Sequence, residues 1–352
     1  MKNIGIIGVG GIANGKHITE LLECKEARIT AICDTDEGAL KRTAERLSLD
    51  TSHCYRDFRE LIDSDEVDAV DICTPNCHHV EMAEYAVRRG KPINVEKPLG
   101  LDLAECLPLE ALLSETGVLN MMCFSYRFMP AVRYAKEMID EGVLGDIVGV
   151  NVAYLKSSAF WEGRRLDWRF VKRYAGTGVL GDLGVHLIDM ATLLVGDVKA
   201  VSAKAGIVVK ERLRLDSDES APVETDDYCN FIATLEDRRT GKETPAVFSI
   251  TRCAIGHANT IRYDIFGTKG SLSFDLNDPT VLSLSVGEEA KSAVLHTEKV
   301  PERFYIKQEE AFVDALHGRL CEHFPTVCDG VRCQRVLDAL LRSSEEGRTV
   351  IL

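Results

Sequence analysis

The first 125 residues alternate short apolar segments with amphipathic ones at a regular pitch, and this rhythm restricts the fold more than any other feature. Strand-like and helix-like segments in alternation are typical of a parallel sheet with crossover helices. We therefore predict an α/β domain with a doubly wound, Rossmann-type parallel sheet. Its expected strands are Asn3–Val9, Arg28–Cys33, His53–Tyr55, Val67–Cys73, Pro92–Val95 and Leu119–Phe124, and a helix is expected at Val80–Arg89.

The rhythm changes after Met129, where longer strand-like segments follow one another with few helices between them. Such an order predicts an α+β domain with a mainly antiparallel open sheet. We assign residues 1–125 to the first domain and 126–352 to the second, with Arg212–Thr225 as a surface loop. The expected strands are Ile147–Leu155, Val198–Val209, Tyr228–Leu235, Ala246–Cys253, Ile261–Phe266 and Leu282–Val286, and the expected helices are Val185–Val195, Ile306–Leu316 and Val331–Glu345.

Composition supports a soluble protein of two domains. The chain has 352 residues, 45% of them hydrophobic, and a formal net charge of -14. That charge disfavours nucleic acid and an anionic membrane surface as partners. We see no apolar run of about 18 residues and no signal segment before the first strand, so we expect a cytoplasmic protein. Its twelve cysteines are expected to be reduced thiols.

A glycine-rich turn, Gly8-Val-Gly-Gly-Ile-Ala13, follows the first expected strand and opens a helix. This is the G-x-G-x-x-A pattern of a dinucleotide site in its required context. Gly8 permits the turn, Gly10 lets the backbone approach a pyrophosphate, and Ala13 keeps helix and strand close. The helix N-terminus offers amide donors to the phosphates. Gly11 and Ile12 complete the predicted cofactor contacts of this turn.

Asp34 ends the second expected strand, about 20 residues beyond the glycines, where a carboxylate accepts hydrogen bonds from the adenosine ribose. Asp36 adds negative charge, and no arginine follows. A 2'-phosphate would be repelled, so we expect NAD rather than NADP. The alternative role for Asp34 is a helix N-cap.

Two further segments lie at the carboxyl ends of expected strands, the edge where open α/β sheets bind ligands. Thr74-Pro75-Asn76 is expected to line the nicotinamide side, or else simply to end a strand and cap a helix. Lys97 in Glu96-Lys97-Pro98 projects from the same edge, or is a surface lysine. His79 and Glu96 are included among the predicted cofactor contacts.

Two other groups deserve a chemical test. Cys73, Cys77, His78 and His79 offer ligand types that zinc accepts, but they lack a paired C-x-x-C spacing, so we predict no metal. Asp182 and His186 are four residues apart and would share a helix face. A histidine with a carboxylate one turn away is an acid/base unit.

These segments together resemble the glucose-fructose oxidoreductase, inositol dehydrogenase and rhizopine-catabolism (Gfo/Idh/MocA) family over nearly the whole chain. The matching segments are GVGGIA, the acidic end of the second strand, TPN, EKP, SYRFMP, DWRF with GTGVLGDLGVHLID, FGTKGSLSF and DALLRSSEEGRTV. The resemblance implies an N-terminal Rossmann domain, a C-terminal domain with an open sheet, and NAD-dependent oxidation of a sugar or cyclitol hydroxyl.

The resemblance also implies roles for single residues. Lys97 would position and polarise the substrate hydroxyl, His186 would accept its proton, and Asp182 would orient the site. Arg127, Trp168 and Arg169 match positions near the cofactor or the substrate, although they are equally explained as packing and surface groups. The chain departs from the family at Thr177, where glycine is usual.

Several alternatives stay open at this stage. A basic segment is either a solvated loop face or a pocket for a carboxylated or phosphorylated sugar; it holds Arg164, Arg165, Arg169, Lys172 and Arg173. The same architecture serves glycosidases that oxidise a sugar transiently with bound NAD, and non-catalytic relatives, although the intact residues Lys97, Asp182 and His186 argue against the latter. The open sheet predicts a homo-oligomer, and the resemblance implies a homodimer or homotetramer.

Overall fold

The computed structural model describes residues 1–292 and 294–352, which divide into two compact units. The first unit contains residues 1–124 and 306–332, and the second contains residues 125–305 and 333–352. The sequence alone suggested one boundary after residue 125, whereas the chain returns to the first unit at residue 306. The reason is long-range packing, because helix α9 (Gln308–Leu316) lies against α1 (Ile18–Leu21).

The first unit contains a parallel sheet of six strands among its described residues, in the order β3-β2-β1-β4-β5-β6. The predicted Rossmann arrangement is confirmed. The order reverses between β1 and β4, which places a ligand site at the carboxyl ends of these strands. The strands are β1 Lys2–Ile7, β2 Ala27–Cys33, β3 Cys54–Tyr55, β4 Ala69–Ile72, β5 Ile93–Val95 and β6 Asn120–Met122, and the crossover helices are α2 Glu37–Leu47, α3 Phe58–Asp63, α4 His79–Arg88 and α5 Leu103–Thr116.

Local chemistry explains these elements. Ile4 through Ile7 are buried in β1, as expected of a parallel strand that is covered on both faces. Helix α5 begins at Asp102, whose carboxylate accepts the backbone N–H of Glu105, and it ends at Gly117 with a φ of +65°. Both are ordinary helix-end signals.

The second unit is built on a sheet of nine strands among the described residues, in the order β16-β15-β14-β13-β7-β12-β11-β8-β17. Only β12 and β7 pair in parallel there, so the prediction of a mainly antiparallel sheet is confirmed. The strands are β7 Ile147–Leu155, β8 Gly196–Gly206, β11 Tyr228–Asp237, β12 Glu243–Thr251, β13 Thr260–Gly267, β14 Gly270–Asp275, β15 Val281–Val286, β16 His296–Lys299 and β17 Val350–Ile351.

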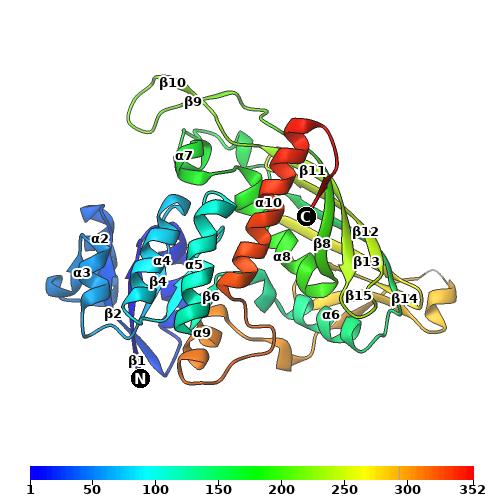
Figure 1. Ribbon diagram of the computed structural model, residues 1–352, viewed down its shortest axis with the longest axis horizontal. Helices are drawn as coiled ribbons and strands as arrows, with labels where there is room; N and C mark the ends of the chain where they lie inside the picture. Colours follow the sequence, from blue (N-terminus) through cyan, green and yellow to red (C-terminus); the bar gives the residue numbers. More distant parts are fainter. Residues whose placement is uncertain (293) are drawn as a thin grey trace. The chain divides into compact units, whose positions relative to one another are not determined.

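Helices cover one side of this sheet. Figure 1 shows α6 (Pro130–Asp140) and α8 (Val185–Leu194) beside the curved layer of strands, and the two helices contact β14, β15 and β8. The other helices of the unit are α7 Lys172–Ala175 and part of α10 Val327–Glu346. Along β11 buried and more exposed residues alternate, and Phe231 stacks on Phe248 of β12 in the core.

One sequence expectation needs correction. The predicted loop Arg212–Thr225 overlaps a short hairpin, β9 (Glu211–Leu213) with β10 (Ser220–Pro222), and the Arg212 guanidinium anchors it by donating to the carbonyl groups of Arg164 and Ala159.

The helical segment Lys172–Leu194 could cross a membrane by length and composition alone. However, 94% of its apolar window is buried inside the unit, as in a core helix of a soluble fold.

Candidate active site

The glycine-rich turn follows β1 as predicted. Gly8 has a φ of +87°, and a Cβ there would lie 2.9 Å from the carbonyl carbon of Cys73, so only glycine fits. At Gly10 and Gly11 no described atom lies within 4 Å of an added Cβ. Ala13 is fully buried at the start of the π-helical turn η1 (Ala13–His17), whereas Ile12 is exposed. The turn thus offers bare, accessible backbone to a phosphate group.

Asp34 joins the end of β2 to this turn. Its Oδ2 accepts the backbone N–H of Val9 at 2.9 Å, and its Oδ1 accepts that of Asp36 at 2.9 Å. Asp36 is the residue that caps α2, through the N–H groups of Gly38 and Ala39. The alternative role of Asp34 as that cap is therefore wrong, and its half-buried carboxylate lies beside the glycines.

The TPN segment lies at the carboxyl end of β4. Thr74 and Pro75 are half-buried, and Asn76 is buried at the start of a 3-10 turn, η3 (Asn76–His78). His79 is turned inward: its ring nitrogens lie 2.8 Å from the carbonyl oxygens of Thr74 and Pro98. His79 thus ties the ends of β4 and β5 together, and cofactor contact through it stays a prediction.

Three of the four residues tested for a metal are poorly suited to bind one. Burial raises the pKa of the Cys73 and Cys77 thiols, which disfavours the thiolate form that a metal requires. Both nitrogens of His79 already face carbonyl oxygens. All twelve cysteines are free of disulfide bonds in the structure.

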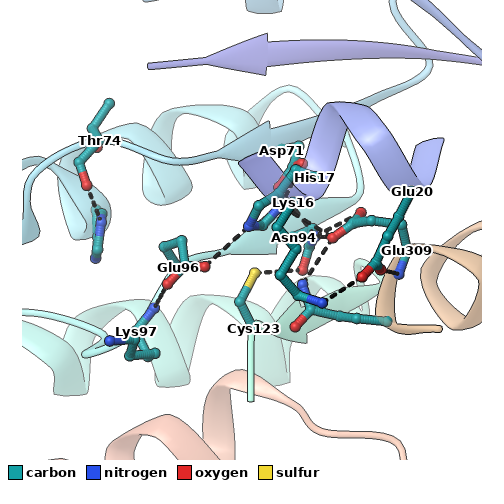
Figure 2. Close-up of polar contacts among 12 residues, drawn as sticks. Lys16, His17, Glu20, Asp71, Thr74, Asn94, Glu96, Lys97, Cys123 and Glu309 are labelled. Atoms are coloured by element: carbon teal, nitrogen blue, oxygen red, sulfur yellow. Dashed lines mark hydrogen bonds and ion pairs between the residues drawn. The ribbon is translucent and has the colours of Figure 1, made fainter. Parts of the chain in front are cut away.

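The EKP segment follows β5. Lys97 is half-buried, and its backbone N–H donates to Oε2 of the buried Glu96 at 3.0 Å. The other oxygen, Glu96 Oε1, lies 3.0 Å from Nε2 of His17 (Figure 2). The Glu96 carboxylate is thus turned toward the interior of the first unit, and the predicted contact between Glu96 and the cofactor stays a prediction.

Asp182 and His186 lie in the second unit, one helical turn apart. Asp182 is half-buried in the π-helical turn η7 (Leu180–Gly184), and His186 follows it on α8, where it is 6% exposed. A spacing of four residues places both side chains on one helix face. Lys97 therefore comes from one unit of the chain, and this acid/base pair comes from the other.

A tight turn fixes the start of that helix. The Asp226 carboxylate accepts the backbone N–H groups of Gly178 at 2.6 Å and Leu180 at 2.9 Å. A Cβ at Gly178 would lie 1.9 Å from the Asp226 carbonyl oxygen, which excludes any side chain there. Thr177 is not among the residues with positive φ, so the departure from glycine at this position leaves the turn intact.

Two tyrosines that the sequence reasoning missed lie beside His186. The rings of Tyr126 and His186 are 4.4 Å apart, and the Tyr126 hydroxyl lies 2.9 Å from that of Tyr154. Tyr154 donates to Oδ1 of Asn259 at 2.8 Å. Burial, with the Tyr126 hydroxyl and the Asp182 charge, raises the pKa of Tyr154, which stays a neutral donor. Tyr126 belongs to the quoted SYRFMP segment, whereas nothing in the sequence pattern marks Tyr154 or Asn259.

The remaining predicted substrate residues have clear partners in the second unit. The Arg127 Nε donates to both oxygens of Asp189, at 2.8 and 3.0 Å, and both residues are buried. The Arg169 guanidinium lies 4.4 Å from the centre of the Trp168 ring. These contacts explain how the side chains are held, and their role in binding substrate stays a prediction.

The basic segment divides between two environments. Arg165 donates to Asp218 and to the Ser217 carbonyl oxygen on the surface hairpin. Lys172 and Arg173, together with Arg214, line a cavity of about 670 Å³. The first environment matches the solvated loop face, and the second leaves room for an anion, so both alternatives retain a physical basis.

Comparison with known families covers most of the chain. Residues 2–124 match the family described as "Oxidoreductase family, NAD-binding Rossmann fold", and residues 132–273 match "GFO/IDH/MocA C-terminal domain".

Individual relatives act on carbohydrate-like molecules, by their names. Levoglucosan dehydrogenase of Pseudarthrobacter phenanthrenivorans is 35% identical over 256 residues, which cover 69% of this chain and 64%, just under two thirds, of that protein. Inositol 2-dehydrogenase of Rhizobium meliloti is 26% identical over 98% of both chains. The 2,7-anhydro-N-acetylneuraminate hydratase of Escherichia coli is 26% identical, over 84% of this chain and 73% of the relative.

A solved structure of levoglucosan dehydrogenase, in complex with NADH and L-sorbose, superposes with a TM-score of 0.89. The two sequences are 26% identical, and the superposition covers 100% of this chain and 98% of the levoglucosan dehydrogenase chain.

Proposed function

Because the chain belongs to the NAD-binding Gfo/Idh/MocA oxidoreductase family, we propose that it transfers a hydride between nicotinamide and a secondary hydroxyl of a sugar or cyclitol. The observation that carries the proposal is the Asp182–His186 pair at the start of α8, with the tyrosine hydroxyls beside it. Such a pair suits removal of a hydroxyl proton, the step that accompanies hydride loss.

The cofactor is NAD, which supplies the hydride acceptor when it is bound. The first unit has the features that such a dinucleotide requires. The backbone at Gly10 and Gly11 is open to a pyrophosphate, and the half-buried Asp34 is fixed beside the turn for the ribose hydroxyls.

In the proposed reaction each protein group has a separate task. The ammonium group of Lys97 binds and polarises the reacting hydroxyl, and His186 accepts its proton. Asp182 orients the site and balances the charge that develops on His186. Tyr126 and Tyr154 supply further hydroxyl partners for a polyol on the same side of the second unit.

A second candidate function uses the cofactor without net turnover. In this function the protein is a glycosidase that oxidises its sugar transiently with bound NAD and then reduces it again. The similarity to a hydratase favours such a redox-neutral reaction. The two functions differ in one measurable quantity, which is the NADH that accumulates. A non-catalytic sugar-binding protein would carry out neither reaction. The intact Lys97, Asp182 and His186 argue against such a role.

The experiment that tests the proposal is a screen of purified protein with NAD and a panel of levoglucosan, myo-inositol, L-sorbose, aldoses and sugar acids. We expect NADH to accumulate with at least one of these compounds. Conversion of a panel compound without NADH would favour the redox-neutral alternative. NADH formation that survives both Lys97→Ala and His186→Ala would overturn the proposed roles.

We further propose that the protein acts in the cytoplasm as a homodimer or homotetramer. The net charge of -14 fits neither nucleic acid nor an anionic membrane as partner. Self-association is supported by apolar side chains on the outer face of the large sheet, where Ile232 of β11 and Val247 of β12 are cross-strand partners and are 58% and 49% exposed.

A further inference from the structure

A cluster of buried ionisable groups lies beneath the ends of β4 and β5, and His17 is at its centre (Figure 2). His17 and Asp71 are fully buried, as is Glu309 of α9, and Glu96 is 7% exposed. His17 Nδ1 lies 2.9 Å from Asp71 Oδ2 and 3.0 Å from Glu309 Oε1, and its Nε2 lies 3.0 Å from Glu96 Oε1. Three carboxyl groups thus surround one imidazole.

Two neutral groups brace the carboxylates. The Asn94 amide donates to Asp71 Oδ1 at 3.0 Å and to both oxygens of Glu309 at 3.2 Å. The Cys123 thiol donates to Asn94 Oδ1 at 3.1 Å. Cys123 therefore holds Asn94, and Asn94 holds the carboxylates of Asp71 and Glu309, so the cluster is a connected hydrogen-bond network.

The arrangement of partners defines the charge of His17. A carboxylate oxygen only accepts hydrogen bonds, and both ring nitrogens face such oxygens, so only the doubly protonated imidazolium can donate to both sides. Burial alone would lower the pKa of His17, but the Asp71 and Glu309 carboxylates outweigh it and raise the pKa well above 6.5. The Cys73 and Cys123 thiols also lie near the ring, and they stay protonated because burial raises the pKa of both. On the same helical segment, Lys16 pairs with Glu20.

We propose that His17 is a positioning residue for Lys97: as an imidazolium it holds the Glu96 carboxylate, and Glu96 in turn holds the backbone N–H of Lys97. The inference rests on the proposed function, in which Lys97 binds the reacting hydroxyl. His17 is not itself at the reacting atoms, because it is fully buried. It acts through Glu96, whose two oxygens contact His17 on one side and the Lys97 backbone on the other.

The chemistry of this relay follows from burial. A charged residue that is out of water must be paired, since an unpaired charge there is strongly unfavourable. Without the positive charge of His17, the three carboxyl groups would repel one another, and Glu96 would become protonated or leave its position. Either change weakens or breaks the hydrogen bond that fixes the Lys97 backbone. Displacing a substrate-binding group by about 1 Å reduces turnover by roughly 100-fold.

A metal ion is the rival explanation for part of the cluster. His17, Asp71 and Cys123 each offer a ligand atom, and these atoms lie within 4.8 Å of one another. However, each of the three atoms already takes part in the hydrogen bonds described above. Burial, together with the nearby Glu96 carboxylate, also raises the pKa of the Cys123 thiol well above its usual value, so it stays protonated. Stoichiometric zinc in the purified protein would overturn the imidazolium assignment.

The charge of His17 can be tested directly in the intact protein. Nuclear magnetic resonance of protein with isotopically labelled histidine distinguishes an imidazolium from a neutral ring, and His17→Gln identifies the signal by its loss. We expect an imidazolium at neutral pH, with both ring nitrogens protonated. A neutral ring at that pH would overturn the proposal.

The positioning role is tested by amide hydrogen exchange at Lys97, which needs no substrate. Loss of one hydrogen bond of ordinary strength predicts about tenfold faster exchange in His17→Gln and in Glu96→Leu, which has no acceptor atom in its side chain. The double variant should exchange no faster than the single ones, because both changes break the same relay. Amides of β1 and β4 should keep their rates, whereas general loosening of the sheet would accelerate them all.

Thr43→Val is the matched control. Thr43 is buried in the same unit and accepts a hydrogen bond from Asn14, but it has no contact with this cluster in the described structure. It should leave exchange at Lys97 unchanged. Additive effects of His17→Gln and Glu96→Leu, or an equal effect of Thr43→Val, would overturn the relay. Activity that persists in Lys97→Ala would instead overturn the proposed function, and would leave the exchange result intact.

Discussion

Asp34 Oδ2 accepts the backbone N–H of Val9 at 2.9 Å, which joins the end of β2 to the glycine-rich turn after β1. The second oxygen is held by the N–H of Asp36 at 2.9 Å. Two backbone donors therefore fix one carboxylate at the place where the adenosine ribose of a dinucleotide lies in this fold. Because Asp36 separately caps α2, changing Asp34 need not disturb that helix.

The first prediction is a strong preference for NAD over NADP. Like charges in close contact cost several kcal/mol, so kcat/KM with NAD should exceed that with NADP by at least about 100-fold. Asp34→Ser combined with Thr35→Arg should reverse the direction of the preference, because a phosphate partner replaces a repelling carboxylate. Asp36→Asn is the control, since an amide also caps a helix. Comparable turnover of both cofactors by the wild-type protein would contradict the assignment.

Particular residues show where the sequence was informative and where it was not. The glycine turn and the ends of β4 and β5 were predictable, because turn chemistry and strand order depend on neighbouring residues. Glu309 was not, since its partner Asn94 is 215 positions away in sequence and a glutamate on a helix normally faces water. Strand β14 was missed although its apolar residues alternate with serines, which is the period-two pattern of a half-buried strand.

The second prediction separates the roles of His186 and Lys97. A general base contributes about 10² to 10⁴ in rate, so His186→Ala should lower kcat by that range and leave NADH affinity nearly unchanged. Lys97→Ala should lower kcat and also raise KM for the polyol, because the ammonium group binds the reacting hydroxyl. Steady-state kinetics with the compound found in the panel, and NADH titration by fluorescence, measure both. A His186→Ala enzyme with most of its activity would return His186 to a structural role.

The third prediction concerns the buried pair of Arg127 and Asp189. Removing one partner of such a pair leaves an uncompensated charge, so Arg127→Met should lower the free energy of unfolding by roughly 3–5 kcal/mol. The double variant with Asp189→Leu should recover most of that loss. Urea unfolding measures both. If the double variant is stable but has a raised KM for the polyol, Arg127 also binds substrate, as the family resemblance implies.

The fourth prediction is self-association through the outer face of the large sheet. Light scattering at micromolar concentration should give a mass of two or four chains. Ile232→Lys with Val247→Lys should reduce it, because two charges would be desolvated at a symmetric interface. Ser249→Lys should have a similar effect, because Ser249 is two residues from Val247 on β12 and lies on the same face of the sheet. A monomeric wild-type protein would contradict the prediction.

The last prediction is a loss of stability as the pH rises above 6.5, caused by His17. Its pKa in the folded protein is raised well above 6.5, so its contribution to stability is complete below that pH and is lost as the pH rises through the folded value. The other groups near the cluster whose pKa values are shifted affect the stability in other pH ranges. The pKa of Asp71 is raised by burial from 3.8 to about 6, so its contribution is lost between those values, and the lowered pKa of His79 matters only below 6.5. Between pH 6.5 and about pH 8, the free energy of unfolding should therefore fall with a slope of at most about 1.4 kcal/mol per pH unit.

Glu309→Gln removes one carboxylate from His17 and should end the decline at a lower pH, because the folded pKa of the imidazole falls. Urea titrations at several pH values measure the slope, and a flat profile over this range in the wild-type protein would show that His17 is not charged in the folded state.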